Sequence, residues 1–127
     1  MMKSSINADI APKAVGGYAQ AVKVSGARDL LFISGQIPAA ADGTVPADFA
    51  GQAKLAWANV MAQLAAAGMT AENLIKATIF LSDRKYALEN RQARQDALGK
   101  HEVALTVVIA GLFDAAWLLE IEAVAAR

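Results

Sequence analysis

The sequence predicts one α+β domain in which two helices cover one face of a single mixed β-sheet. The chain has 127 residues, the length of one domain, which we place at residues 1–127. Two stretches with apolar residues at helical spacing alternate with stretches rich in β-branched residues. Hydrophobic residues make up 56% of the chain and charged residues 19%, so it can form a core and is not disordered.

Two strands are expected first, at Tyr18–Ser25 and Asp29–Ile37. Gly26 lies in the short connection between them and favours a tight turn, so we predict that the two strands form a hairpin. Residues 1–17 are polar and end in two glycines, and we expect them to form a loop. Residues 38–46 contain two prolines and are expected to form a second loop.

The first helix is expected to begin after Asp48, whose side chain can accept a hydrogen bond from the first turn, and to end at Gly68. We assign the polar residues Gln52 and Asn59 to its solvent-exposed side. The apolar positions at helical spacing are Phe49, Ala53, Ala56, Trp57, Val60, Leu64 and Ala67.

The second half of the chain contains a second helix, which Asp83 can cap and Gly99 can end. The elements expected here are a strand at 74–81, the helix at 84–98 and strands at 102–109 and 117–125. The predicted order is therefore β-β-α-β-α-β-β. Because the last two strands are apolar on both faces, we expect oligomerisation to bury the sheet face that the helices leave uncovered.

Composition and charge argue against several classes of function. The chain has no cysteine, which removes thiol nucleophiles and thiolate metal sites. Twelve Lys and Arg balance twelve Asp and Glu, so we expect no nucleic-acid partner. No segment approaches the ~20 apolar residues of a membrane span, and we expect a cytoplasmic protein. The single histidine, His101, lies in a predicted loop, and we expect neither a metal nor another cofactor.

Two carboxylates stand out in the last strand. Glu120 and Glu122 lie two residues apart in an apolar run, so both side chains leave the same face of the sheet. A carboxylate within a buried strand is costly unless it is paired or used in chemistry. One interpretation is an edge strand with one solvated face. The other is that at least one of the two carboxylates acts as a general acid or base, or orients a water molecule.

Two further segments could line a cleft. Ser34 and Gly35 end an apolar strand just before Pro38, and a glycine there allows close approach of the backbone. Tyr18 follows Gly16-Gly17, so a loop could present its ring to a ligand. Packing of the Tyr18 ring at the start of the first strand is an equally good interpretation of the pattern.

Taken in order along the chain, several motifs resemble the RidA/YjgF family of reactive-imine deaminases. The segments that carry the resemblance are Gly16-Gly17-Tyr18-Ala19-Gln20, Phe32-Ile33-Ser34-Gly35-Gln36-Ile37-Pro38, Ile75-Lys76-Ala77-Thr78-Ile79-Phe80, Tyr86 with Asn90, and Glu120-Ile121-Glu122-Ala123-Val124. The resemblance implies a chorismate-mutase-like fold and a homotrimer. The sheets of such a trimer form a central barrel, and small molecules bind in clefts between the subunits.

The resemblance also implies a set of site residues. Glu120 and Tyr18 take the positions of the family's catalytic glutamate and tyrosine, which position the attacking water in the hydrolysis of an enamine or imine to a carbonyl compound and ammonia. The substrate-binding positions implied are Ser34, Gly35, Asn90, Ala104, Leu105 and Thr106.

One departure from the family pattern bears on activity. The family's deaminases bind the substrate carboxylate with an arginine, and that position falls on Ala104, or on Leu105 if the register shifts by one residue. A planar guanidinium suits this task because it donates two parallel hydrogen bonds to a carboxylate. We therefore expect a RidA-like trimer that binds or hydrolyses a different small molecule from 2-aminoacrylate.

Two alternatives remain open. The chain could be an imine deaminase in which Arg91, Arg94 or Lys100 supplies the missing charge. The second alternative is the ribonuclease or translation-inhibitor role of some family members, which the neutral charge balance disfavours.

Overall fold

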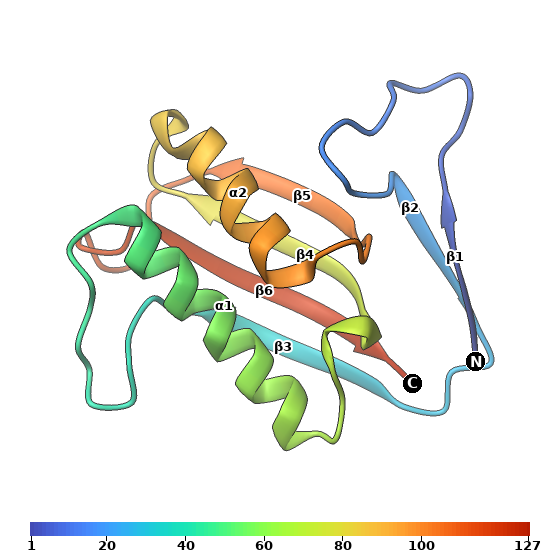
Figure 1. Ribbon diagram of the computed structural model, residues 1–127, viewed down its shortest axis with the longest axis horizontal. Coiled ribbons are helices and arrows are strands. Elements are labelled where there is room, and N and C mark those ends of the chain that lie inside the picture. The colour runs from blue at the N-terminus through green and yellow to red at the C-terminus, as the bar shows by residue number, and fades with distance from the viewer.

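The computed structural model describes residues 1–127 and has an α+β fold with both helices on one face of a four-stranded sheet (Figure 1). The strand order in this sheet is β3-β6-β4-β5. Strands β4 and β5 are parallel, whereas β6 is antiparallel to both of its neighbours, so the sheet is mixed as predicted. Its elements are β3 (Leu30–Gln36), α1 (Phe49–Ala66), β4 (Leu74–Leu81), α2 (Ala87–Leu98), β5 (Ala104–Ile109) and β6 (Leu119–Ala126).

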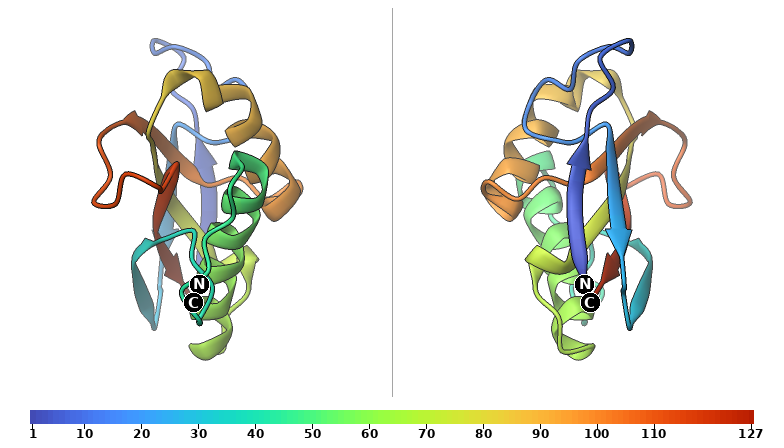
Figure 2. Two further views of the ribbon diagram at one scale, coloured as in Figure 1. Left: turned by 90° about the vertical axis from the view of Figure 1, so that its left-hand side faces the viewer. Right: turned by 90° about the vertical axis from the view of Figure 1, so that its right-hand side faces the viewer.

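The predicted hairpin between the first two strands is wrong. Strand β2 (Ala21–Ser25) pairs instead with β1 (Met2–Ile6), an N-terminal strand that the polar sequence did not predict. Strand β3 pairs only with β6, so the chain contains two sheets rather than one. The β1–β2 ribbon stands at one end of the main sheet (Figures 1 and 2). It is attached there by a backbone hydrogen bond of 3.0 Å from Ala19 N to Val103 O.

Helix α1 begins and ends where the sequence predicts. The Asp48 side chain accepts a hydrogen bond from Gly51 N at 3.0 Å, and Gly68 has a φ of 72°, which a residue with a side chain rarely adopts. Its apolar side packs against the sheet and forms most of the core with β4 and β6. Helix α2 begins later than predicted, because Asp83 caps a short 3-10 turn, Arg84–Tyr86, that precedes the helix.

The assignment of Gln52 and Asn59 to solvent is wrong. Gln52 is only 2% exposed, and its carboxamide bonds three backbone groups: Nε2 donates to Pro46 O and Ala116 O, and Oε1 accepts from Leu118 N. The half-buried Asn59 donates to two carbonyl groups of the loop after β3. Both side chains therefore hold loops against α1.

The face of the main sheet opposite the helices, which we call the open face, is uncovered in the single chain (Figure 2). Alternate residues of β4 and β6 point to it, since their sequence neighbours are buried in the core. Leu30 and Phe32 are 57% and 74% exposed on it. The burial of this face by other subunits stays a prediction. No helix in the structure has the length and apolar character needed to cross a membrane.

Candidate functional site

Glu120 lies on the open face. Its neighbours Leu119 and Ile121 are fully buried in the core, so the side chain of Glu120 points away from the helices. Glu120 is half-buried, whereas Glu122, two residues on, is exposed on the same face. The prediction that both carboxylates leave one face is therefore confirmed.

The carboxylate of Glu120 packs directly on Gly35. A Cβ atom placed on Gly35 would overlap the Glu120 carboxylate and would lie only 2.8 Å from its Cδ atom. This contact is possible because the pairing of β3 with β6 is irregular between Ile33 and Gln36, where Ser34 and Gly35 lie. The structure thus brings together two of the predicted site residues, Gly35 and Glu120, and a third, Ser34, precedes Gly35 in the chain.

Tyr18 lies at a different place, beside the start of β5. The residue that follows it, Ala19, forms an isolated parallel bridge with Ala104 at the outer edge of that strand. The half-buried Tyr18 is therefore close to Ala104 in the fold.

One chain does not bring Tyr18 and Glu120 together. Glu120 is opposite Phe80, which pairs with Val108, whereas Ala104 is four residues earlier on β5. Each set of paired residues forms a row across the sheet. At ~3.3 Å per residue, the row that contains Glu120 and the row that contains Ala104 are about 13 Å apart along the strands. The predicted catalytic pair is therefore divided between the two ends of the open face.

The three predicted residues of β5 point in different directions. Leu105 packs against the core, whereas Ala104 and Thr106 share the open face with Lys76. Lys76 Nζ donates a hydrogen bond of 2.7 Å to Thr106 Oγ1, and Lys76 is directly opposite Ala104 in the parallel register. Only Ala104, and not Leu105, could present a side chain to the open face.

Sequence reasoning did not single out Lys76. Lys76 is the one charged residue in the mostly apolar run from Leu74 to Leu81. It lies two residues before Thr78, and this spacing alone could have placed both side chains on the same face of the sheet. Its partner on β5 could not have been found in this way, because the register between β4 and β5 is not encoded locally.

Helix α2 holds the segment in front of Tyr18. Arg94 is only 3% exposed, and its guanidinium donates to Gly16 O at 2.6 Å and to Gly17 O at 3.4 Å. Gln95 Nε2 also donates to Gly16 O, at 3.3 Å. Burial lowers the pKa of Arg94, and the charge of Arg91 lowers it further, whereas Tyr18 acts in the opposite direction.

Two other polar residues lie away from the open face. Asn90, a predicted substrate-binding residue, is 4% exposed on α2, and its carboxamide oxygen has no hydrogen-bond partner. His101 Nε2 donates to Leu74 O at 2.8 Å, so the only histidine has a structural partner. No three His, Asp or Glu side chains lie close enough together to hold a metal ion.

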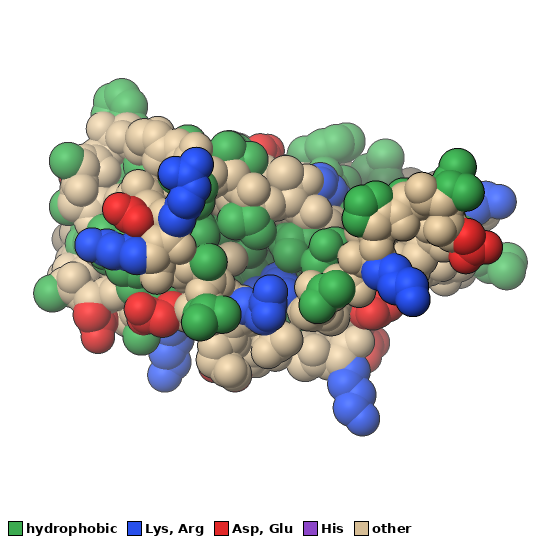
Figure 3. Space-filling model, turned by 90° about the horizontal axis from the view of Figure 1, so that it is seen from above, with side chains coloured by type: hydrophobic (Ala, Val, Ile, Leu, Met, Phe, Trp, Pro, Cys, Tyr) green, Lys and Arg blue, Asp and Glu red, His purple; other side chains and the backbone are tan.

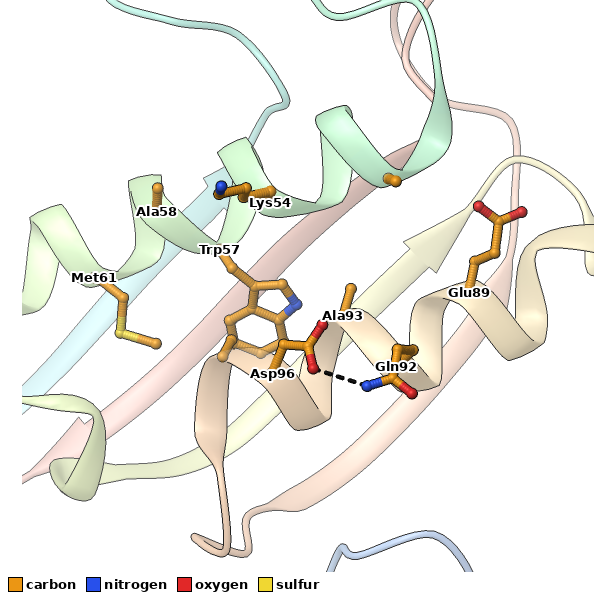
Figure 4. Close-up of a pocket in the computed structure, with 10 residues that line it drawn as sticks. Lys54, Trp57, Ala58, Met61, Glu89, Gln92, Ala93 and Asp96 are labelled. Atoms are coloured by element: carbon orange, nitrogen blue, oxygen red, sulfur yellow. Dashed lines mark hydrogen bonds between the residues drawn. The ribbon is translucent and has the colours of Figure 1, made fainter.

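A groove of about 580 Å³ runs between α1 and α2 on the helix side of the molecule (Figure 4). The Trp57 side chain lies between the two helices, and the small side chains of Ala93 and Ala97 leave the space open. Lys54 and Asp96 are among its charged residues. None of the predicted site residues lines this groove.

Comparison with known proteins places this arrangement in a family. The profile of the endoribonuclease L-PSP family matches residues 8–127. A RutC family protein of Haemophilus influenzae is 36% identical over 139 aligned residues, which cover 100% of this chain and 99% of that protein. The 2-iminobutanoate/2-iminopropanoate deaminase of Escherichia coli K12 is 39% identical over 83 residues, which cover 65% of this chain and 62% of that enzyme.

The fold is also found in a solved structure. A crystal structure of the Rid-family protein YyfB from Yersinia pestis superposes with a TM-score of 0.86 over 100% of both chains, at 23% sequence identity. The chain therefore belongs to the endoribonuclease L-PSP family, also known as RidA/YjgF, and has its α+β fold.

Proposed function

We propose that the chain forms a homotrimer that binds or hydrolyses a small molecule in clefts between its subunits. The observation that carries this proposal is the close packing of the Glu120 carboxylate on Gly35 at the open face. A half-buried carboxylate on this face is suited to orient a water molecule or to accept its proton. In the family's reaction, that water attacks the carbon of a C=N bond, and the products are a carbonyl compound and ammonia.

The division of the site supports assembly from more than one subunit. Tyr18 and Glu120 lie in rows about 13 Å apart along the strands of one chain, too far apart to contact one small substrate atom together. A second copy packed on the open face could supply the missing half. The exposed side chains of Leu30 and Phe32 give this face an apolar surface that favours such packing.

The substrate of this site is expected to differ from that of the family's deaminases. The small side chain of Ala104 offers no charge where the family has its arginine, and Leu105 packs against the core. A second candidate, an imine deaminase with another cation, is favoured by Lys76, which shares the open face with Ala104. The Escherichia coli relative is named for 2-imino acids, which carry a carboxylate that such a cation could bind. The zero net charge continues to disfavour an RNA substrate.

The test is ammonia release from freshly generated 2-aminoacrylate, with the Escherichia coli 2-iminobutanoate/2-iminopropanoate deaminase as the positive control. We expect a rate at the background without protein. A rate near that of the control would overturn this expectation and establish the second candidate.

A binding measurement tests the site itself. We expect 2-oxobutanoate, the keto acid that corresponds to 2-iminobutanoate, to shift the NMR signal of the Gly35 amide. Glu120→Gln keeps the volume and removes the charge, so it should change this response while leaving the melting temperature nearly unchanged. Glu122→Gln is the matched control. If Glu120→Gln unfolds or dissociates the protein, Glu120 has a structural role and the site is wrongly placed.

A further inference from the structure

Two arginines from α2 converge on the glycine segment that precedes Tyr18. Arg94 reaches the carbonyl oxygens of Gly16 and Gly17 from the buried side. Arg91 lies against the same segment, since a Cβ atom on Gly16 would be only 3.1 Å from its Nε atom. Gly16 has a φ of 106° and Gly17 a φ of 85°, so the segment bends in a way that only glycine adopts readily.

No acidic group balances these two charges. The ion pairs of the structure, Arg28 with Asp29 and Arg127 with Asp29, do not involve either arginine of α2. Burial and then the charge of Arg91 lower the pKa of Arg94, because the two cations repel each other. In addition, the buried Nε atom of Arg94 has no hydrogen-bond partner. Neutral carbonyl groups satisfy some donors of a guanidinium but leave its charge uncompensated, and a buried charge of this kind is costly.

We propose that Arg91 and Arg94 form an anion site that binds the carboxylate of a small molecule beside Tyr18. Arg91 is exposed and can contact the anion directly with its planar fork of donors. Arg94 holds the Gly16–Gly17 segment in place and adds a second positive charge. Seen from above, Lys and Arg side chains lie at the surface between the helix layer and the N-terminal segment (Figure 3).

This inference deepens the proposed function, on which it rests, by naming the ligand class and the cations that bind it. The position is different from that of the family arginine, which falls on Ala104 of β5. The two positions are nevertheless close in the fold, because Ala19 bridges to Ala104 just after Tyr18. A carboxylate bound by α2 would therefore lie at the same end of the open face, next to the family's own site.

The experiment titrates the full-length protein with 2-oxobutanoate and follows the backbone amides of Gly16, Gly17 and Tyr18 by NMR. Methyl 2-oxobutanoate has nearly the same shape but no charge, and serves as the control ligand. We expect saturable shifts with the acid and none with the ester. In Arg91→Gln, the loss of one charge-assisted contact should weaken binding about tenfold or more. Raising the salt concentration should weaken it further, because Arg91 is exposed.

Three more variants identify the cation. Arg94→Lys keeps the charge but cannot reach both carbonyl groups, and should also weaken binding, with Lys100→Gln as the control that leaves it unchanged. The inference is overturned if Arg91→Gln binds the acid as well as the wild type, or if the wild type shows no shifts at Gly16 and Gly17. If Lys76→Gln alone abolishes binding, the anion is held on the open face instead. Shifts confined to Gly35 would refute this inference and leave the proposed function standing, whereas no shifts anywhere would refute both.

Discussion

The carboxylate of Glu120 occupies the space that a side chain on Gly35 would need. Gly35 is not among the glycines with positive φ, so its backbone conformation does not require glycine. The requirement comes from the neighbouring strand, where the half-buried Glu120 turns its side chain across the irregular pairing of β3 with β6. A glycine in the middle of a strand normally weakens it, and here the close approach of a carboxylate explains its presence.

Gly35→Ala is expected to displace the Glu120 carboxylate. The new methyl group cannot fit without movement of Glu120 or β3, so ligand binding or turnover at this site should fall by about 10- to 100-fold. The atoms that must move are the far end of a flexible, half-buried side chain, so the free energy of unfolding should fall by less than about 1 kcal/mol. The control is Gly111→Ala, where a Cβ atom would meet nothing within 4 Å. Ligand titration and urea unfolding check both effects, and equal behaviour of the two variants would contradict the prediction.

Gln52→Leu is expected to destabilise the fold strongly. The change leaves three backbone groups of two loops without the partner that Gln52 provides: Pro46 O, Ala116 O and Leu118 N. An unsatisfied buried group costs about 1–3 kcal/mol, and we expect a loss of about 3 kcal/mol in the free energy of unfolding. Gln63→Leu changes an exposed glutamine of the same helix and should stay within about 0.5 kcal/mol of the wild type. Chemical denaturation measures the free energy of unfolding of both variants. Equal values would contradict a structural role for Gln52.

Phe32→Lys is expected to break the proposed homotrimer. Phe32 is 74% exposed on the open face of the single chain, so a lysine there costs little in the monomer but puts a charge into an apolar subunit interface. Sedimentation should give a mass of three times 13.3 kDa for the wild type and a smaller mass for the variant. Leu88→Lys, at a similarly exposed leucine of α2, is the control and should keep the trimer. A wild-type protein that sediments as a stable monomer would refute the proposed assembly.

The helices could be predicted from the sequence because their signals are local. The cap at Asp48 and the glycines at the helix ends, Gly68 and Gly99, act within one turn of their own position. The pairing of the first strands could not be predicted in this way. Gly26 does lie at a bend of the chain, with a φ of 68°, but the partner of β2 is a polar strand that carries no hydrophobic pattern.

The candidate site could be predicted from the sequence only where its signals are local. The period of two along β6 places Glu120 and Glu122 on one face, and the structure confirms it. The helical period of α1 wrongly assigns Gln52 to the solvent-exposed side. Its side chain is buried because it bonds backbone groups of two loops, one of which is 64 residues away in sequence. The same is true of Arg94, which meets Gly16 across 78 residues of chain. Polar residues whose partners are non-local carry no signal in a sequence pattern.

Restoring the family guanidinium is expected to create or raise imine deaminase activity. Ala104→Arg places it on the open face at the end of the sheet near Tyr18, whereas Leu105→Arg would push a charge into the core and should destabilise the fold. Lys76 is directly opposite position 104, and like charges in that arrangement repel, so the gain should be larger when Lys76→Ser is added. The assay is ammonia release from 2-aminoacrylate by the folded variants. If neither the single nor the double variant exceeds the wild-type rate, the site has changed in more than its arginine, and Glu120 does not position water for an imine substrate.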